Sequence, residues 1–88
     1  MPYIHPESRD DFDGGIEGLV QALAATGFQP GNLNYVITRL VRGFLGEQEN
    51  YTAYNEAVGV LECAKLELYR RMVAPYEFVK MTENGEVY

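Results

Sequence analysis

The sequence from residue 57 to residue 71 reads Ala57-Val-Gly-Val-Leu-Glu-Cys-Ala-Lys-Leu-Glu-Leu-Tyr-Arg-Arg71, and this stretch decides the fold. Apolar residues recur in it and directly after it at spacings of three and four, which is typical of one face of an α-helix: Ala57, Leu61, Ala64, Leu68 and Met72. We expect a helix that begins near Tyr51 and ends near Ala74, because Pro75 cannot donate a backbone hydrogen bond. Such a helix has about 24 residues and a length of roughly 36 Å.

A second side of this long helix is also apolar. It carries Val58, Leu66, Tyr69 and Val73. Two shorter helices can cover the first side, but the second side then needs another partner. A second copy of the chain is the simplest partner, so the sequence predicts a homo-oligomer, with a dimer favoured.

Two shorter helices are predicted before the long one. The first spans about residues 8–26 and has the apolar residues Phe12, Ile16, Leu19, Val20 and Leu23 on one face. Gly27 suits the left-handed position that ends a helix. The second helix spans about residues 32–45, and Gly46 is expected to end it in the same way.

The sequence allows two alternatives for the segment after Pro75. Asn84-Gly85 favours a tight β-turn, so residues 76–88 form either a small β-hairpin or an extended tail. An isolated hairpin is only marginally stable in water. The predicted fold is therefore an all-α single domain over residues 1–88, with three helices, the third one long, and a tail or small hairpin over residues 75–88.

Composition excludes several classes of protein. The 88 residues are 47% hydrophobic and carry a formal net charge of −6, which disfavours binding to nucleic acid. No apolar run is long enough to span a membrane, and the N-terminal residues lack the pattern of a signal peptide, so we expect a cytoplasmic protein. The single cysteine, Cys63, excludes an internal disulfide and a multi-cysteine metal site. We expect no cofactor.

Glu62 is the first candidate for a functional residue because it lies within the second apolar side, with Asn55 two turns earlier. If a partner covers this side, the carboxylate needs a cation, a hydroxyl or a metal, since an unpaired buried charge is costly. The alternative is a partly open side on which Glu62 is solvated or paired with Lys65 or Arg70. We favour this alternative, since ionisable residues are rarely buried.

Two enzymatic interpretations lack the residue spacing that their chemistry needs. A magnesium-dependent nucleotide hydrolase needs carboxylates one turn apart on facing helices, and Glu56, Glu62 and Glu67 do not have that spacing. Cys63 and His5 could act as nucleophile and base, but a cysteine within a helix is more often a packing residue.

The end of the long helix offers further binding candidates. Arg70 and Arg71 favourably offset the helix dipole, and they could also bind Glu77 or an external phosphate. Tyr69 and Tyr76 combine a large apolar ring with a hydroxyl, which suits a partly wet interface. Their spacing identifies no specific ligand.

Four short sequence motifs carry a family resemblance: Leu33-Asn-Tyr35, Gly59-Val-Leu-Glu-Cys-Ala-Lys-Leu-Glu-Leu-Tyr-Arg-Arg71, Pro75-Tyr-Glu77 and Asn84-Gly-Glu-Val-Tyr88. Through these motifs, residues 30 to 88 resemble a set of short proteins from bacteria, archaea and phages that are classed as a domain of unknown function. The resemblance implies a small intracellular protein, in some cases carried by mobile elements. It implies no activity, cofactor or catalytic residue.

Taken together, these features predict a small non-enzymatic protein-interaction or regulatory module that acts as a homo-oligomer. The alternative is a small metal-dependent nucleotide hydrolase that uses helix carboxylates.

Overall fold

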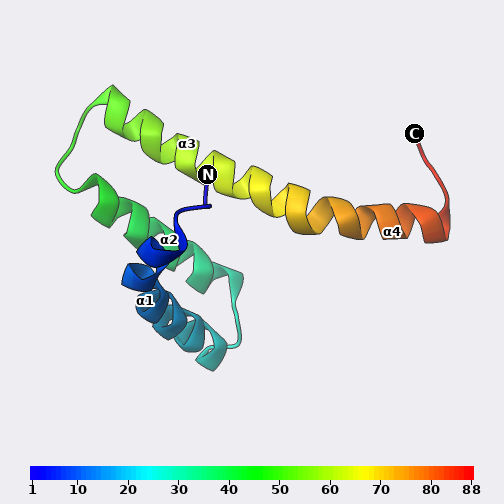
Figure 1. The fold of residues 1–88 in the computed structure, drawn as a ribbon, viewed down its shortest axis with the longest axis horizontal. Helices are drawn as coiled ribbons and strands as arrows, with labels where there is room; N and C mark the ends of the chain where they lie inside the picture. The colour runs from blue at the N-terminus through cyan, green and yellow to red at the C-terminus, as the bar shows by residue number, and fades with distance from the viewer.

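The computed structural model describes all residues, 1–88, and it is helical with no strand. Its elements are α1 (Pro6–Ala25), α2 (Pro30–Leu45), α3 (Tyr51–Leu68), a five-residue π-helical turn η1 (Tyr69–Val73) and α4 (Ala74–Asn84). Since α3, η1 and α4 follow one another without a break, they form one long third helix (Figure 1). The predicted all-α fold with three helices, the third one long, is confirmed.

The helix ends follow from local sequence. Gly27 adopts a φ of 79° after α1, and Phe28 N–H donates to the carbonyl of Leu23 at 2.9 Å, as in a Schellman motif. Gly46 ends α2 with a φ of 58°, and its N–H donates to the carbonyl of Arg42. Both glycine ends were predicted, because only glycine adopts these angles without strain.

The start of α3 is capped by a side chain. Asn50 precedes the helix in an extended conformation, and its side-chain oxygen accepts a hydrogen bond of 2.9 Å from the N–H of Ala53. A cap of this kind satisfies one of the backbone donors that the first turn of a helix leaves unpaired.

The predicted end of the third helix at Ala74 is wrong. The chain passes Pro75 and remains helical to Asn84, because the turn before the proline widens. In this π turn the N–H of Ala74 donates to the carbonyl of Tyr69, five residues earlier. A π turn absorbs one extra residue and eases the clash that a proline ring causes with the preceding turn of a regular α-helix.

Of the two alternatives left open for residues 76–88, the structure has no hairpin, and the tail is shorter than expected because residues up to Asn84 belong to α4. Asn84-Gly85 ends this helix instead of forming a hairpin turn: Gly85 has a φ of 96°, and its N–H donates to the carbonyl of Met81 at 2.8 Å. Only the last four residues form a tail.

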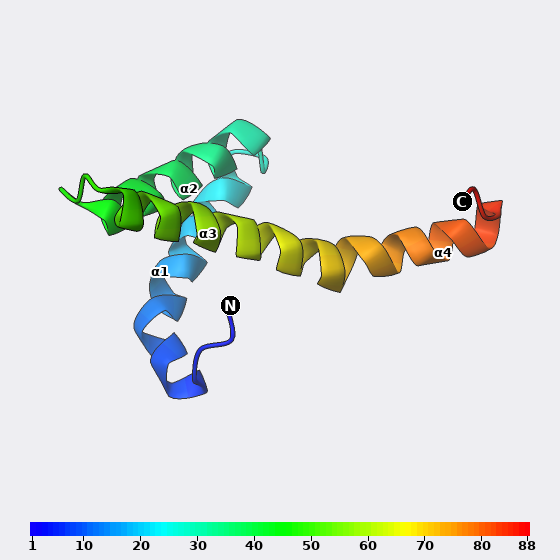
Figure 2. The ribbon, with the colours of Figure 1, turned by 90° about the horizontal axis from the view of Figure 1, so that it is seen from above.

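The core is very small. Three of the 88 residues are buried, and they lie where the end of α2 meets the start of α3: Leu45, Ala53 and Ala57. The radius of gyration is 16.7 Å, whereas a compact domain of this length has about 12 Å. The helices therefore form an open arrangement in which α4 projects away from α1 and α2 (Figures 1 and 2).

Candidate interaction surface

Apolar side chains remain open on every helix. On α1 the predicted inner face is exposed, including Phe12, Ile16 and Val20, and on α2 the same holds for Leu33, Ile37 and Leu40. These are the residues that helical spacing assigned to a core. Within one chain these faces stay open, because the buried residues lie only where α2 meets α3 and α1 contributes none of them.

A small groove lies between α2 and α3. Its lining is wholly apolar and consists of Leu40, Val41, Phe44, Ala57 and Val60. The groove continues from the buried cluster toward solvent, because Val41 packs against that cluster while Phe44 and Val60 are exposed. An apolar concave surface beside a small core can accept the side chains of another helix.

The second side of α3 is open, as the sequence indicated. Val58, Leu66 and Tyr69 are exposed, and Val73 is half-buried. Asn55, on the same side, is exposed and makes no side-chain hydrogen bond. Met1 and Pro2 lie near Cys63 and Leu66, so the N-terminal segment covers part of the edge of this side.

Glu62 is paired with a neighbour on its own helix. Its carboxylate lies 2.9 Å from Nζ of Lys65, one turn later, and its side chain is 53% exposed. The favoured interpretation, an open side with Glu62 paired to Lys65, describes this geometry. Exposed pairs at this spacing contribute little to stability.

Glu67 is the most enclosed carboxylate, with 19% of its side chain exposed. It accepts a hydrogen bond from the hydroxyl of Tyr3, and two more, of 2.9 and 2.8 Å, from Nη2 of Arg70. The hydrogen bond from Tyr3, followed by that from Arg70, lowers the pKa of Glu67 below its ordinary value. The same contact raises the pKa of the Tyr3 hydroxyl.

This contact fastens the N-terminal segment to α3 across 64 positions of sequence. Sequence reasoning missed it, because neither residue stands in a recognisable motif. Tyr3 lies outside every helical pattern, and Glu67 looks like any acid on a solvated face.

The remaining candidates gather near the π turn. Tyr69 donates a hydrogen bond of 3.1 Å to Oε2 of Glu77, which raises the pKa of the Tyr69 hydroxyl. Glu77 therefore pairs with a tyrosine and not with Arg70 or Arg71. Tyr76 is exposed, and Nζ of Lys80 lies 5.7 Å from the centre of its ring, in a cation–π geometry.

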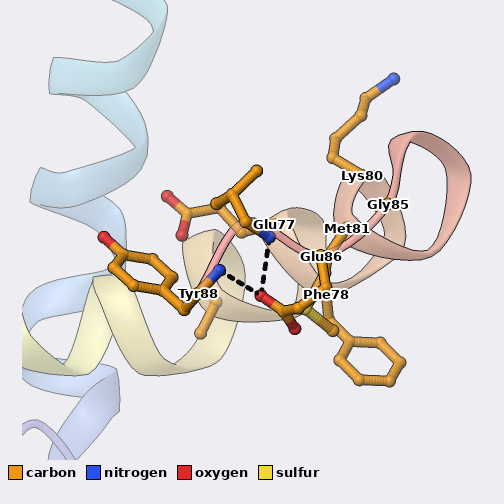
Figure 3. Close-up of a pocket in the computed structure, with 9 residues that line it drawn as sticks. Glu77, Phe78, Lys80, Met81, Gly85, Glu86 and Tyr88 are labelled. Atoms are coloured by element: carbon orange, nitrogen blue, oxygen red, sulfur yellow. Dashed lines mark hydrogen bonds between the residues drawn. The ribbon is translucent and has the colours of Figure 1, made fainter.

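A shallow pocket lies between α4 and the C-terminal tail (Figure 3). The tail turns back beside the helix, and the carboxylate of Glu86 accepts hydrogen bonds of 3.0 Å from the N–H groups of Val87 and Tyr88. Ala74, Phe78 and Met81 line the helix side of the pocket. The tail thus partly covers one face of α4 and leaves its other faces open.

The acidic side chains of the chain do not gather at one place. No group of three or more His, Cys, Asp or Glu side chains converges as metal ligands would. Glu62 and Glu67 instead pair with different neighbours, Lys65 and Arg70. Cys63 is exposed, and no hydrogen bond connects it to His5. The convergence of carboxylates that a metal-dependent hydrolase requires is not present.

The chain is thus a small helical protein whose recognisable surface features are open apolar faces. It belongs to the family described as Domain of unknown function (DUF6899), whose model matches residues 1–87. No curated protein and no solved structure matched the chain. None of the helices combines the length and the apolar character that crossing a membrane requires.

Proposed function

We propose that this protein is a non-enzymatic protein-interaction module that acts as a homo-oligomer, in its simplest form a dimer, in the cytoplasm. The proposal extends to an accessory or regulatory role toward a further protein, and to carriage of some family members by mobile elements. One observation carries it: the apolar side chains that should form a core are exposed.

The size of the exposed surface supports this proposal. One chain of 9.9 kDa exposes 7834 Å². A compact monomer of the same mass exposes about 5,200 Å². The excess is about 2,600 Å² per chain, whereas obligate dimers bury roughly 1,000–2,500 Å² per partner.

The chemistry of the surface supports the same conclusion. Isolated apolar side chains are normal on a protein surface, but contiguous apolar faces on several helices mark an interaction site. The exposed residues follow helical spacing on α1, α2 and α3, so each helix offers a face and not scattered positions. Such faces associate with other apolar faces, which a second copy of the same chain supplies in equal number.

Sedimentation velocity at micromolar concentration tests the proposal. We expect a particle with at least twice the mass of one 9.9 kDa chain. Val87→Ser should leave this mass unchanged, because Val87 is exposed in the tail and lies outside the helix faces. A wild-type protein that remains monomeric throughout the micromolar range would refute the proposal.

A further inference from the structure

We propose that the two copies exchange arms. The arm, defined as η1 and α4 (Tyr69–Asn84), of each copy lies on the body, defined as α1 and α2, of the other copy. This inference rests on the proposed self-association and adds which surfaces meet. The exchange is reciprocal, as a two-fold symmetric dimer requires.

The arm has no large partner within its own chain. In both views α4 lies well away from α1 and α2 (Figures 1 and 2). Three apolar side chains at helical spacing form what we name the arm face: Met72, Tyr76 and Val79, which are 66%, 63% and 52% exposed. The tail lies beside a different side of α4, which carries Ala74, Phe78 and Met81, so the arm face remains free to bind.

The body offers a surface of matching length and character. The arm has 16 residues and is therefore about 24 Å long. α2 also has 16 residues and α1 has 20. Both carry exposed apolar faces, and the wholly apolar groove between α2 and α3 lies at their edge. A helix that lays an apolar face into such a surface is a common mode of recognition.

Charge also favours this pairing. α1 has five acidic residues and one arginine, a net charge of −4: Glu7, Asp10, Asp11, Asp13 and Glu17 against Arg9. The arm has three basic and two acidic residues, a net charge of +1: Arg70, Arg71 and Lys80 against Glu77 and Glu83. Complementary charges at the rim of an interface direct association and fix the orientation of the partners.

The exchange also accounts for the exposed area. Each chain buries surface twice, once on the arm that it supplies and once on the body that receives an arm. These two contacts can share the excess of about 2,600 Å² per chain, which is of the size that obligate dimers bury. A dimer through the second side of α3 alone would leave the arm face and the body open.

Paramagnetic relaxation enhancement between copies provides the test. One sample of the full chain is isotopically labelled. The other is unlabelled and carries Cys63→Ser, Glu83→Cys and a nitroxide at position 83, near the end of the arm. The two are unfolded in urea, mixed and refolded, so that mixed dimers form. We expect signal loss at amides of the labelled chain in α1 and α2.

The control sample carries a diamagnetic label at position 83, and sedimentation of the same mixture reports its mass. A dimeric mixture in which signal loss is confined to α3 and α4 would overturn the arm exchange and leave the proposed self-association intact. A monomeric mixture would overturn both. The two failures are therefore distinguishable.

A charge exchange gives a second, independent measurement. Chains with Arg71→Glu and Lys80→Glu, and chains with Asp11→Lys and Asp13→Lys, should each dimerise at least tenfold more weakly at low salt. An equal mixture should regain the wild-type affinity, because each altered arm then meets an altered body. If the mixture stays as weak as the separate variants, the arm does not lie on α1. Circular dichroism of each variant confirms that the helices form.

Discussion

Diluting the protein 100-fold, from about 100 µM to about 1 µM, is expected to lower its thermal unfolding midpoint, because folding is coupled to association. The reason lies in the missing core, since one chain buries only Leu45, Ala53 and Ala57. If assembly covers half of the excess surface, and about 65% of that area is apolar, burial contributes roughly 20 kcal/mol per chain. This is a gross figure, which the entropy lost on association and ordering offsets in large part, so only the remainder stabilises the folded dimer.

The expected shift follows from the chain length. With about 0.7 kcal/mol of unfolding enthalpy per residue, two chains of 88 residues unfold with about 120 kcal/mol. For a dimer that unfolds to two separate chains near 60 °C, each tenfold dilution then lowers the midpoint by about 4 °C. A 100-fold dilution should lower it by about 8 °C.

Far-ultraviolet circular dichroism measures the melting at the two concentrations in cells of different path length. A monomer that folds by itself would show the same midpoint at both. A constant midpoint, together with a monomeric mass, would refute the reasoning that the exposed faces are covered by a second copy. If the unfolding midpoint instead falls steadily over a series of tenfold dilutions, the slope of midpoint against concentration gives the number of chains in the folded unit.

Three further predictions concern the core, the π turn and the N-terminal contact. Leu45→Ala should lower the free energy of unfolding by about 2–3 kcal/mol in urea titrations, because it removes the largest buried side chain. Pro75→Ala should convert the π turn to α-helix, since the N–H of residue 75 can then donate to the carbonyl of Arg71. NMR chemical shifts would show this change. α4 should then rotate by about 100° around the helix axis, so that the protein associates more weakly. Tyr3→Phe should return the pKa of Glu67 toward its ordinary 4.5, as measured by NMR titration. In the wild type, the carboxylate of Glu67 stabilises the N-terminal contact fully above pH 4.5, and this contribution is lost as the pH falls through its lowered pKa. The hydroxyl of Tyr3 stabilises the contact fully below pH 10.0, and this contribution is lost as the pH rises through its raised pKa.

Each of these predictions has a control. Val87→Ala changes an exposed side chain and should leave the urea midpoint within experimental error. Pro30→Ala changes the proline at the first position of α2, outside the third helix, and should not affect the π turn. Tyr51→Phe removes a hydroxyl that makes no hydrogen bond and should leave the pKa of Glu67 unchanged. Unchanged π-turn shifts in Pro75→Ala would mean that the proline does not cause the wide turn.

Helix positions were readable from sequence where the signal is local. Gly27 and Gly46 end α1 and α2 because glycine tolerates a positive φ. The side-chain cap that Asn50 forms at the start of α3 was not predicted. The end of the third helix was misjudged, since the rule against proline within a helix holds for regular α-helix. Here the wider π turn before Pro75 lets the helix continue past the proline.

The candidate site was only partly readable. Spacing indicated the open second side of α3 and offered Lys65 and Arg70 as possible partners of Glu62, because these depend on neighbours within the same helix; the structure has the Lys65 pair. The contact of Tyr3 with Glu67 joins two segments that are far apart in sequence, so no local pattern predicts it. The arm face was likewise missed, because it exists only if the helix continues beyond Pro75.

By itself, the sequence of residues 57–71 determined that this protein has a long helix with more apolar surface than two short helices can cover, since helical periodicity is a property of the chain alone. Only the tertiary structure decided how little of that surface one chain covers, and that the helix runs on as a projecting arm. The physical reason is that burial depends on which faces meet in space, whereas sequence spacing states only which residues share a face.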